Sequence, residues 1–123
     1  MKKILITEDS PTMRSLLVST IESLDGYCIV EANSGFEALR LLPRENVDLI
    51  ITDINMPDIN GLELISFVKG HPQYKDIPMI VVSTERSEED RRRGLALGAS
   101  GYIVKPFKGD ELQELVRRVL SAA

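Results

Sequence analysis

The chain has 123 residues, a length that suits one domain with a hydrophobic core of its own, and its formal net charge is -4. This acidic balance argues against nonspecific binding to nucleic acid or acidic membranes, and no apolar run approaches the roughly 20 residues needed to cross a bilayer. The single cysteine, Cys28, excludes an internal disulfide and fits a reducing cytoplasm, and its apolar neighbours predict a small core residue.

Strand-like and helix-like segments alternate along the whole chain. Five short apolar segments predict strands at residues 3–7, 27–31, 47–52, 78–83 and 102–104. Each is followed by a segment that reads as a helix. Five alternations of this kind predict a parallel sheet covered by helices on both faces, because a helix carries the chain back before the next parallel strand begins.

Local signals mark the first two predicted helices. Ser10 and Pro11 form an N-cap followed by proline in the first turn, and Gly26 stops that helix. The sequence SGFE, residues 34–37, matches a capping box at the start of a second helix, which runs to Pro43.

The later helices differ in character. Asn60 and Gly61 open the third, and SEED at residues 87–90 opens a charged fourth helix that Gly98 ends. We expect the fourth helix to be weakly anchored, because few apolar residues hold it. Those residues are Leu95, Ala96 and Leu97. The last helix has an amphipathic stripe formed by Leu112, Leu115, Val116, Val119 and Leu120.

Reactive side chains follow four of the predicted strands. They are Glu8 and Asp9 after the first, Asp53 after the third, Ser83 and Thr84 at the end of the fourth, and Lys105 with Pro106 after the fifth. In an open parallel sheet these ends share one edge, and function sits where the strand order reverses. If the order is 2-1-3-4-5, the three carboxylates crowd together and either raise a pKa or recruit a cation. Oxygen ligands of this kind suit Mg²⁺ or Mn²⁺.

Four motifs in this order resemble the receiver domains of two-component response regulators over essentially the whole chain: ITED, TDINMPDINGLEL, IPMIVVST and GASGYIVKPF. The nearest likeness is to stand-alone chemotaxis regulators. The resemblance implies a flavodoxin-like (βα)5 three-layer sandwich with strand order 2-1-3-4-5, formed by one receiver domain over residues 1–123. It implies a cytoplasmic signalling switch and not an enzyme, in which Asp53 accepts a phosphoryl group from a sensor histidine kinase with Mg²⁺ as cofactor.

The same resemblance assigns the metal ligands. Glu8, Asp9, Asp53 and the backbone carbonyl of Asn55 match the metal-binding positions, and Glu8 stands where the family usually has aspartate. Asn55 together with Glu85 matches the pair of residues that sets the dephosphorylation rate.

The resemblance also assigns roles to residues at the fourth and fifth strands. Ser83 and Lys105 match the residues that bind the phosphoryl oxygens, and the bond from Lys105 to Pro106 is expected to be cis. Tyr102 matches the aromatic residue that turns inward on activation. The charge that develops on the phosphoryl group would be neutralised by the metal and by Lys105.

The resemblance also implies two kinds of protein partner. One is the kinase, and the other is a downstream target that reads the surface formed by the fourth helix, residues 102–104 and the last helix. We expect a monomer that binds no nucleic acid. Residues 91–93 are arginines, but three acidic residues precede them, which favours a solvated helix face over a phosphate contact.

Other functions share parts of this pattern. In a flavodoxin the first strand leads into a phosphate loop rich in glycine and hydroxyl groups, whereas TEDSPTM is acidic here. A haloacid-dehalogenase-type phosphatase has an acid where this chain has Asn55, and a pseudo-receiver used for docking needs no intact site. Within the receiver family, Asn55 with Glu85 favours a chemotaxis-like protein over a phosphorelay shuttle. A receiver cut from a larger regulator stays open.

Overall fold

The structure, a computed structural model, describes residues 1–84 and 88–121. Within them, five strands form one parallel sheet in the order β2-β1-β3-β4-β5. The strands are β1 (Lys2–Thr7), β2 (Tyr27–Ala32), β3 (Leu49–Asp53), β4 (Met79–Ser83) and β5 (Gly101–Val104). The predicted fold and strand order are therefore confirmed, and the order reverses beside β1, where β2 lies on one side and β3 on the other.

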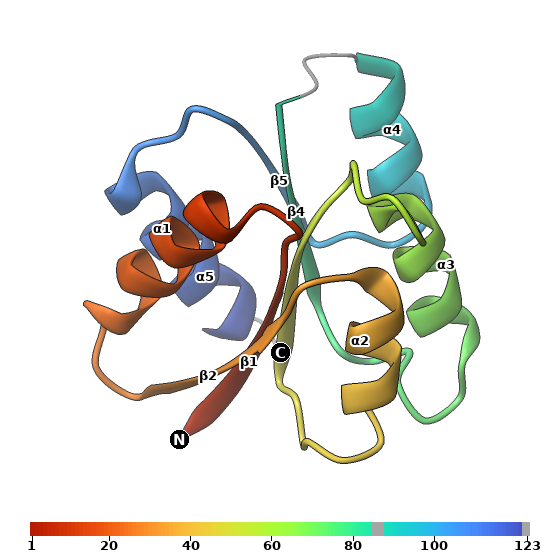
Figure 1. Ribbon diagram of the computed structural model, residues 1–123, viewed down its shortest axis with the longest axis horizontal. Helices are drawn as coiled ribbons and strands as arrows, with labels where there is room; N and C mark the ends of the chain where they lie inside the picture. Colours follow the sequence, from red (N-terminus) through yellow and green to blue (C-terminus); the bar gives the residue numbers. More distant parts are fainter. Residues whose placement is uncertain (85–87, 122–123) are drawn as a thin grey trace.

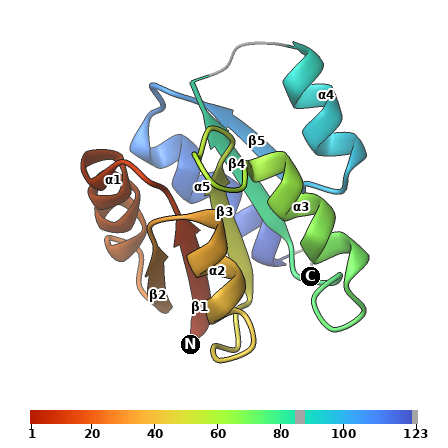
Figure 2. The same cartoon turned by 45° about the vertical axis from the view of Figure 1, so that its right-hand side comes forward.

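Helices cover both faces of the sheet. They are α1 (Pro11–Glu22), α2 (Gly35–Leu41), α3 (Gly61–Gly70), α4 (Glu88–Ala96) and α5 (Gly109–Ser121). Figure 1 shows α1 and α5 on one side of the sheet and α2, α3 and α4 on the other, and the turned view in Figure 2 agrees. No helix in the described part of the chain combines the length and the apolar character that a membrane crossing requires.

Side chains of the central strands alternate between two apolar cores. On β1, Ile4 and Ile6 pack into the core beneath α1 and α5, whereas Leu5 packs into the core beneath α2 and α3. Every residue of β3 and β4 is buried. A strand covered on both faces has no side for polar residues, which explains the continuous apolar runs in the sequence.

Cys28 is exposed, so the prediction that it is a core residue is wrong. Its strand, β2, lies at the edge of the sheet, pairs only with β1, and has a single buried residue, Ala32. An apolar sequence neighbourhood does not distinguish an edge strand from a central one, because strand order is fixed by tertiary contacts.

Side-chain caps begin the first three helices, but the complete capping box is not where the sequence predicts it. At α2, Ser34 Oγ accepts from Glu37 N–H (3.1 Å), yet the Glu37 carboxylate accepts from the N–H of Asn33 (2.7 Å) and not from that of Ser34. The reciprocal pair forms at α3, where Asn60 Oδ1 accepts from Glu63 N–H (2.9 Å) and the Glu63 carboxylate accepts from Asn60 N–H (3.0 Å). At α1, Ser10 Oγ accepts from Met13 N–H as predicted.

The apolar residues at the end of α4 do not anchor it, contrary to the prediction. Leu95 and Leu97 are 42% and 37% exposed, and Ala96 is also exposed. The buried residue of the helix is Gly94, which lies over Leu62 of α3. The buried contact of the helix with α3 is therefore made at a residue without a side chain, whereas Leu95 is partly exposed.

The arginines of α4 form ion pairs one turn back along the helix. Arg91, Arg92 and Arg93 pair with Glu88, Glu89 and Asp90 respectively. These pairs are largely exposed, so each contributes little to stability. The prediction of a solvated charged face is confirmed.

Thr7, the last residue of β1, is fully buried, and its hydroxyl is the one buried side-chain polar atom without a hydrogen-bond partner among residues 1–84 and 88–121. Its register partner on β3, Thr52, is equally buried but donates its hydroxyl to the Asp53 carbonyl (3.0 Å). A buried polar group without a partner destabilises the folded state.

We therefore predict that Thr7→Val stabilises the protein by about 1 kcal/mol or more, because the substitution keeps the shape and removes the unpaired hydroxyl. Denaturant unfolding measures the difference. The matched control is Thr52→Val, which makes the same chemical change at an equally buried position but removes a hydrogen bond. Equal effects of the two substitutions would contradict the prediction.

Candidate functional site

Glu8, Asp53 and Lys105 meet at the carboxyl end of the sheet, at the point where the strand order reverses. Thr7 pairs with Thr52 in the β1–β3 register, so the residues that follow them, Glu8 and Asp53, are neighbours. The Glu8 N–H donates to the Ala32 carbonyl (3.1 Å), which fixes the backbone of Glu8 as a continuation of the β1–β2 ladder. The predicted convergence of strand ends is thus present.

The ammonium group of Lys105 joins the two carboxylates. Lys105 Nζ lies 2.7 Å from Glu8 Oε1 and 3.4 Å from Asp53 Oδ1, and the three side chains are 8%, 1% and 8% exposed. The backbone N–H of Lys105 donates to the Ser83 carbonyl (2.7 Å), and the peptide bond to Pro106 is cis, as predicted. From the end of β5, the lysine side chain therefore reaches across β4 to β3 and β1.

The site carries more negative than positive charge. Glu8, Asp9 and Asp53 each offer an oxygen, and these oxygens lie within 4.8 Å of one another. Burial raises the pKa of Glu8 and of Asp53, and the attraction of Lys105 only partly offsets this effect. One ammonium group does not balance three carboxylates, so the donor set fits a divalent cation with a preference for oxygen ligands.

Both oxygens of Glu8 already have protein partners. Oε1 pairs with Lys105, and Oε2 accepts from the N–H of Ser10 (3.2 Å). Asp9, by contrast, is exposed at the mouth of the site. Between the two adjacent acids, the geometry favours Asp9 for a direct bond to a cation and Glu8 for holding Lys105.

Arg14 holds the loop that carries these acids, a role that no sequence pattern indicated. Its guanidinium donates to the Glu8 carbonyl (2.9 Å) and pairs with the Glu31 carboxylate on β2 (3.2 Å). Arg14 lies one turn into α1, whereas Glu31 is 17 residues further along the chain. Only the pairing of β1 with β2 brings the two together.

The other predicted site residues lie around this cluster. Ser83 is buried at the end of β4, and Asn55 is exposed two residues after the end of β3. Tyr102 is half-buried on β5 and packs against the core beneath α2 and α3. Tyr102 is therefore outside the charged cluster itself. Glu85 lies outside the described residues.

Gly61 sets the position of the loop after Asp53. Its N–H donates to the Ile54 carbonyl (2.8 Å), and a Cβ at this position would lie 2.3 Å from the Asp53 carbonyl oxygen. No side chain can be accommodated at that distance, so glycine is needed for the start of α3 to pack against the end of β3.

The sequence and the fold of this chain are similar to those of known proteins. The sequence model of the response regulator receiver domain matches residues 4–117. A chemotaxis protein CheY homolog from Campylobacter jejuni is 41% identical over 119 residues, which cover 96% of this chain and 92% of that protein. The structure of Vibrio cholerae chemotaxis protein CheY4 has a TM-score of 0.89 and 37% identity, and the match covers 97% of this chain and 98% of that one.

A third similar protein was solved with a metal ion. It is the receiver domain of a Pseudomonas aeruginosa sensor histidine kinase, with a magnesium ion coordinated in its active-site cleft. The TM-score is 0.87 and the identity is 28%, and the match covers 98% of each chain.

The raised pKa of Asp53 predicts a cost in stability. A carboxyl group whose pKa is higher in the folded than in the unfolded protein lowers stability as the pH rises through the interval between the two values, because the folded state then binds more protons. At neutral pH without divalent cations, we expect Asp53→Asn to stabilise the fold, on the order of 1 kcal/mol for relief of an incompletely compensated buried charge.

Denaturant unfolding at pH 7 in the presence of a chelator measures this effect. The control is Asp25→Asn, which changes the net charge equally at an exposed position before β2. The prediction fails if the two substitutions change the unfolding free energy to the same extent.

Proposed function

Because the chain belongs to the response regulator receiver domain family, we propose that it is a phosphorylation-activated switch in which Asp53 accepts a phosphoryl group from a sensor histidine kinase. The observation that carries the proposal is the placement of Asp53 at the reversal of the strand order, 3.4 Å from Lys105 and beside the oxygens of Glu8 and Asp9. A nucleophilic carboxylate, a lysine and a set of oxygen ligands are the groups that phosphoryl transfer requires.

Each residue has a distinct part in this reaction. A carboxylate oxygen of Asp53 attacks the phosphorus, and the bond from phosphorus to the histidine nitrogen of the donor breaks. Lys105 donates hydrogen bonds to the phosphoryl oxygens, and Ser83 at the end of β4 supplies a hydroxyl group. The role of the protein is mainly to position these groups and to stabilise charge.

A divalent cation completes the site. Asp9, Asp53 and the backbone carbonyl of Asn55 would hold Mg²⁺ or Mn²⁺, with Glu8 contributing from beside Lys105. The ion supplies positive charge for the transferred phosphoryl oxygens. The similar Pseudomonas aeruginosa receiver domain holds magnesium in its active-site cleft, which supports the assignment.

Removal of the phosphoryl group is proposed to be controlled at the rim of the site. Asn55 is exposed two residues after the end of β3, where its side chain can flank water approaching the phosphorus. Glu85 is expected to act together with Asn55 in setting the rate of dephosphorylation. The protein would thereby assist its own dephosphorylation without acting on any other substrate.

We predict that a small phosphodonor with Mg²⁺ labels the wild-type protein at Asp53 and that Asp53→Asn abolishes the label. In Asp9→Ala, Mg²⁺ should no longer promote labelling, although the protein stays folded. Intact mass before and after incubation measures the label. Label retained in the Asp53→Asn protein would contradict the assignment, and Asp25→Asn serves as a control that should be labelled normally.

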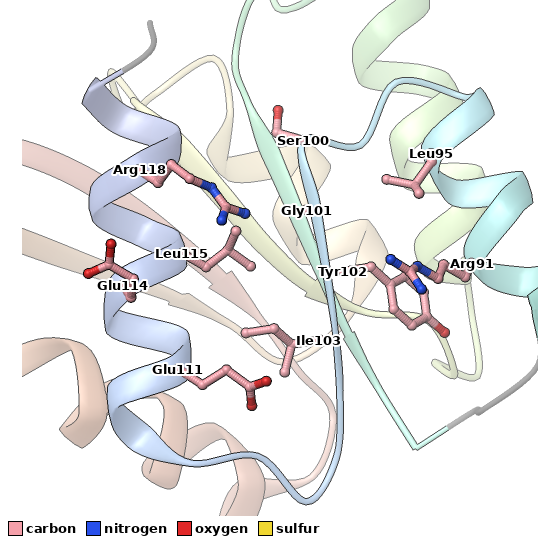
Figure 3. A pocket seen from close by; sticks show the side chains of 10 residues that line it. All are labelled: Arg91, Leu95, Ser100, Gly101, Tyr102, Ile103, Glu111, Glu114, Leu115 and Arg118. Atoms are coloured by element: carbon pink, nitrogen blue, oxygen red, sulfur yellow. The ribbon is translucent and has the colours of Figure 1, made fainter.

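The proposed output surface is formed by α4, β5 and α5. These elements enclose a groove of about 420 Å³. Figure 3 shows side chains from both helices on either side of β5, with Tyr102 and Arg91 both lining the groove. The lining combines apolar residues (Leu95, Ile103 and Leu115) with charged ones (Arg91, Glu111, Glu114 and Arg118). A partner with an amphipathic segment suits this lining.

Tyr102 connects this groove to the site. It lies on β5 three residues before Lys105, and its register partner on β4, Val81, is two residues before Ser83. Movement of the Ser83 hydroxyl toward a phosphoryl group would allow Tyr102 to turn inward and α4 to shift. The partial exposure of Leu95 and the contact of α4 through Gly94 fit an element that moves at low cost.

The surrounding system is proposed to be chemotaxis-like, with the protein acting as a monomer. The similarity to CheY proteins from Campylobacter jejuni and Vibrio cholerae over nearly the whole of both chains supports this choice. The alternatives are a receiver within a larger regulator or kinase, or a phosphorelay shuttle.

We predict that a phosphoryl mimic bound with Mg²⁺ changes the amide chemical shifts of α4 and Tyr102. Ser83→Ala should bind the mimic but show smaller changes at Tyr102, because the coupling hydroxyl is absent. Changes confined to α1, where kinases dock in this family, would refute the proposed output surface. The Asp53→Asn protein, which lacks the carboxylate at which the mimic is proposed to bind, gives the baseline chemical shifts.

A further inference from the structure

The loop between β3 and α3 is hydrogen-bonded to the first turn of α2. Asp58, in this loop, accepts hydrogen bonds from two backbone N–H groups at the start of α2. Its Oδ1 lies 3.2 Å from Gly35 N, and its Oδ2 lies 2.9 Å from Phe36 N. Both oxygens of one carboxylate thus bind the first turn of a helix more than 20 residues earlier in the chain.

The charge on Asp58 suits this position. Burial acts to raise its pKa, but hydrogen bonds from backbone N–H groups, including those of Phe36 and Gly35, outweigh this effect, and the pKa is lowered. A carboxylate is also favoured at a helix N-terminus by the helix dipole. Asp58 is therefore ionised at neutral pH, and its hydrogen bonds are charge-assisted.

Two close contacts hold the rest of the loop. A Cβ on Gly35 would lie 2.7 Å from Ile59 Cβ, so the loop lies directly against the start of α2. At its other end, Gly61 packs against the Asp53 carbonyl, as described above. The segment that carries Asn55 is therefore held between the end of β3 and the start of α2, and Asp58 supplies the polar part of that second contact.

We propose that Asp58 is a positioning residue of the phosphoacceptor site, which it serves by tying the Asn55-bearing loop to α2. The inference rests on the proposed function, because the Asn55 carbonyl matters only if it faces a bound cation. Groups that orient metal ligands without touching the metal typically change metal affinity about 10- to 100-fold when removed. Because Asp58 is an exposed residue, the lower end of this range fits, and we expect about a tenfold loss of Mg²⁺ affinity in Asp58→Ala.

The chain offers a matched control in Ser34. Its hydroxyl also caps α2, but through the N–H of Glu37 inside the same helix (3.1 Å). Ser34→Ala weakens α2 without removing a bond to the β3–α3 loop. A general loosening of α2 would affect both variants, whereas positioning of the loop depends on Asp58 alone.

The test is a Mg²⁺ titration of the full chain, followed by amide chemical shifts, for the wild type, Asp58→Ala, Asp58→Asn and Ser34→Ala. We expect about tenfold weaker binding in Asp58→Ala, an intermediate value in Asp58→Asn because the amide keeps one acceptor oxygen, and wild-type affinity in Ser34→Ala. Wild-type affinity in Asp58→Ala, or equal loss in Ser34→Ala, would overturn the inference.

A second measurement needs no metal. Amide hydrogen exchange of Asn55 and Met56 in a chelator should be faster in Asp58→Ala than in the wild type and unchanged in Ser34→Ala. Unchanged exchange in Asp58→Ala would overturn the positioning role. Failure of the wild-type protein to bind Mg²⁺ would instead overturn the proposed function, so the two failures are distinguishable.

Discussion

The contact on which the rest of the site depends is the buried bridge from Lys105 to Glu8 and Asp53. It joins residues at the carboxyl ends of the first, third and fifth strands, so it forms only if the sheet has this order and register. Removing the lysine would leave two buried carboxylates without compensation, which is strongly destabilising. The bridge therefore ties the sheet topology to the chemistry: the lysine that would stabilise a phosphoryl group also makes the buried carboxylates tolerable.

The compensation is incomplete, and this has a functional meaning. Burial raises the pKa of both Glu8 and Asp53 even though Lys105 lies beside them. A site with an excess of negative charge suits a divalent cation, whose binding would relieve the repulsion between the carboxylates. The buried, unpaired hydroxyl of Thr7 directly before Glu8 is a second unfavourable feature at the same edge of the sheet. Functional sites commonly retain such local costs because the remaining core offsets them.

Two series of contacts lead from the proposed phosphoacceptor site to the surface. One passes from Ser83 along β4 and β5 to Tyr102 and the groove beside α4. This helix contacts α3 through Gly94, and its Leu95 is partly exposed. The other passes from Asp53 through the β3–α3 loop to α2, where Asp58 binds the helix N-terminus. The first series is suited to movement, whereas the second is held by close backbone contacts and is suited to rigidity. A phosphorylation switch requires both a rigid site and a surface element that can move in response to it.

The sequence by itself determined the alternation of strands and helices, the two-sided burial of the central strands and the placement of Glu8, Asp53 and Lys105 at strand ends. These features follow from local periodicity and from the rule that parallel strands end at one edge. Only the tertiary structure decided that Cys28 is exposed on an edge strand, that the complete capping box belongs to Asn60 and Glu63, and that Gly94 and not the leucines packs α4. The tertiary structure also decided the contacts of Arg14 and Asp58, because each joins groups that are far apart in the chain and have no shared sequence pattern. Periodicity reports which residues are apolar, but the neighbours of an edge strand, a helix end or a loop carboxylate are fixed only when the layers pack.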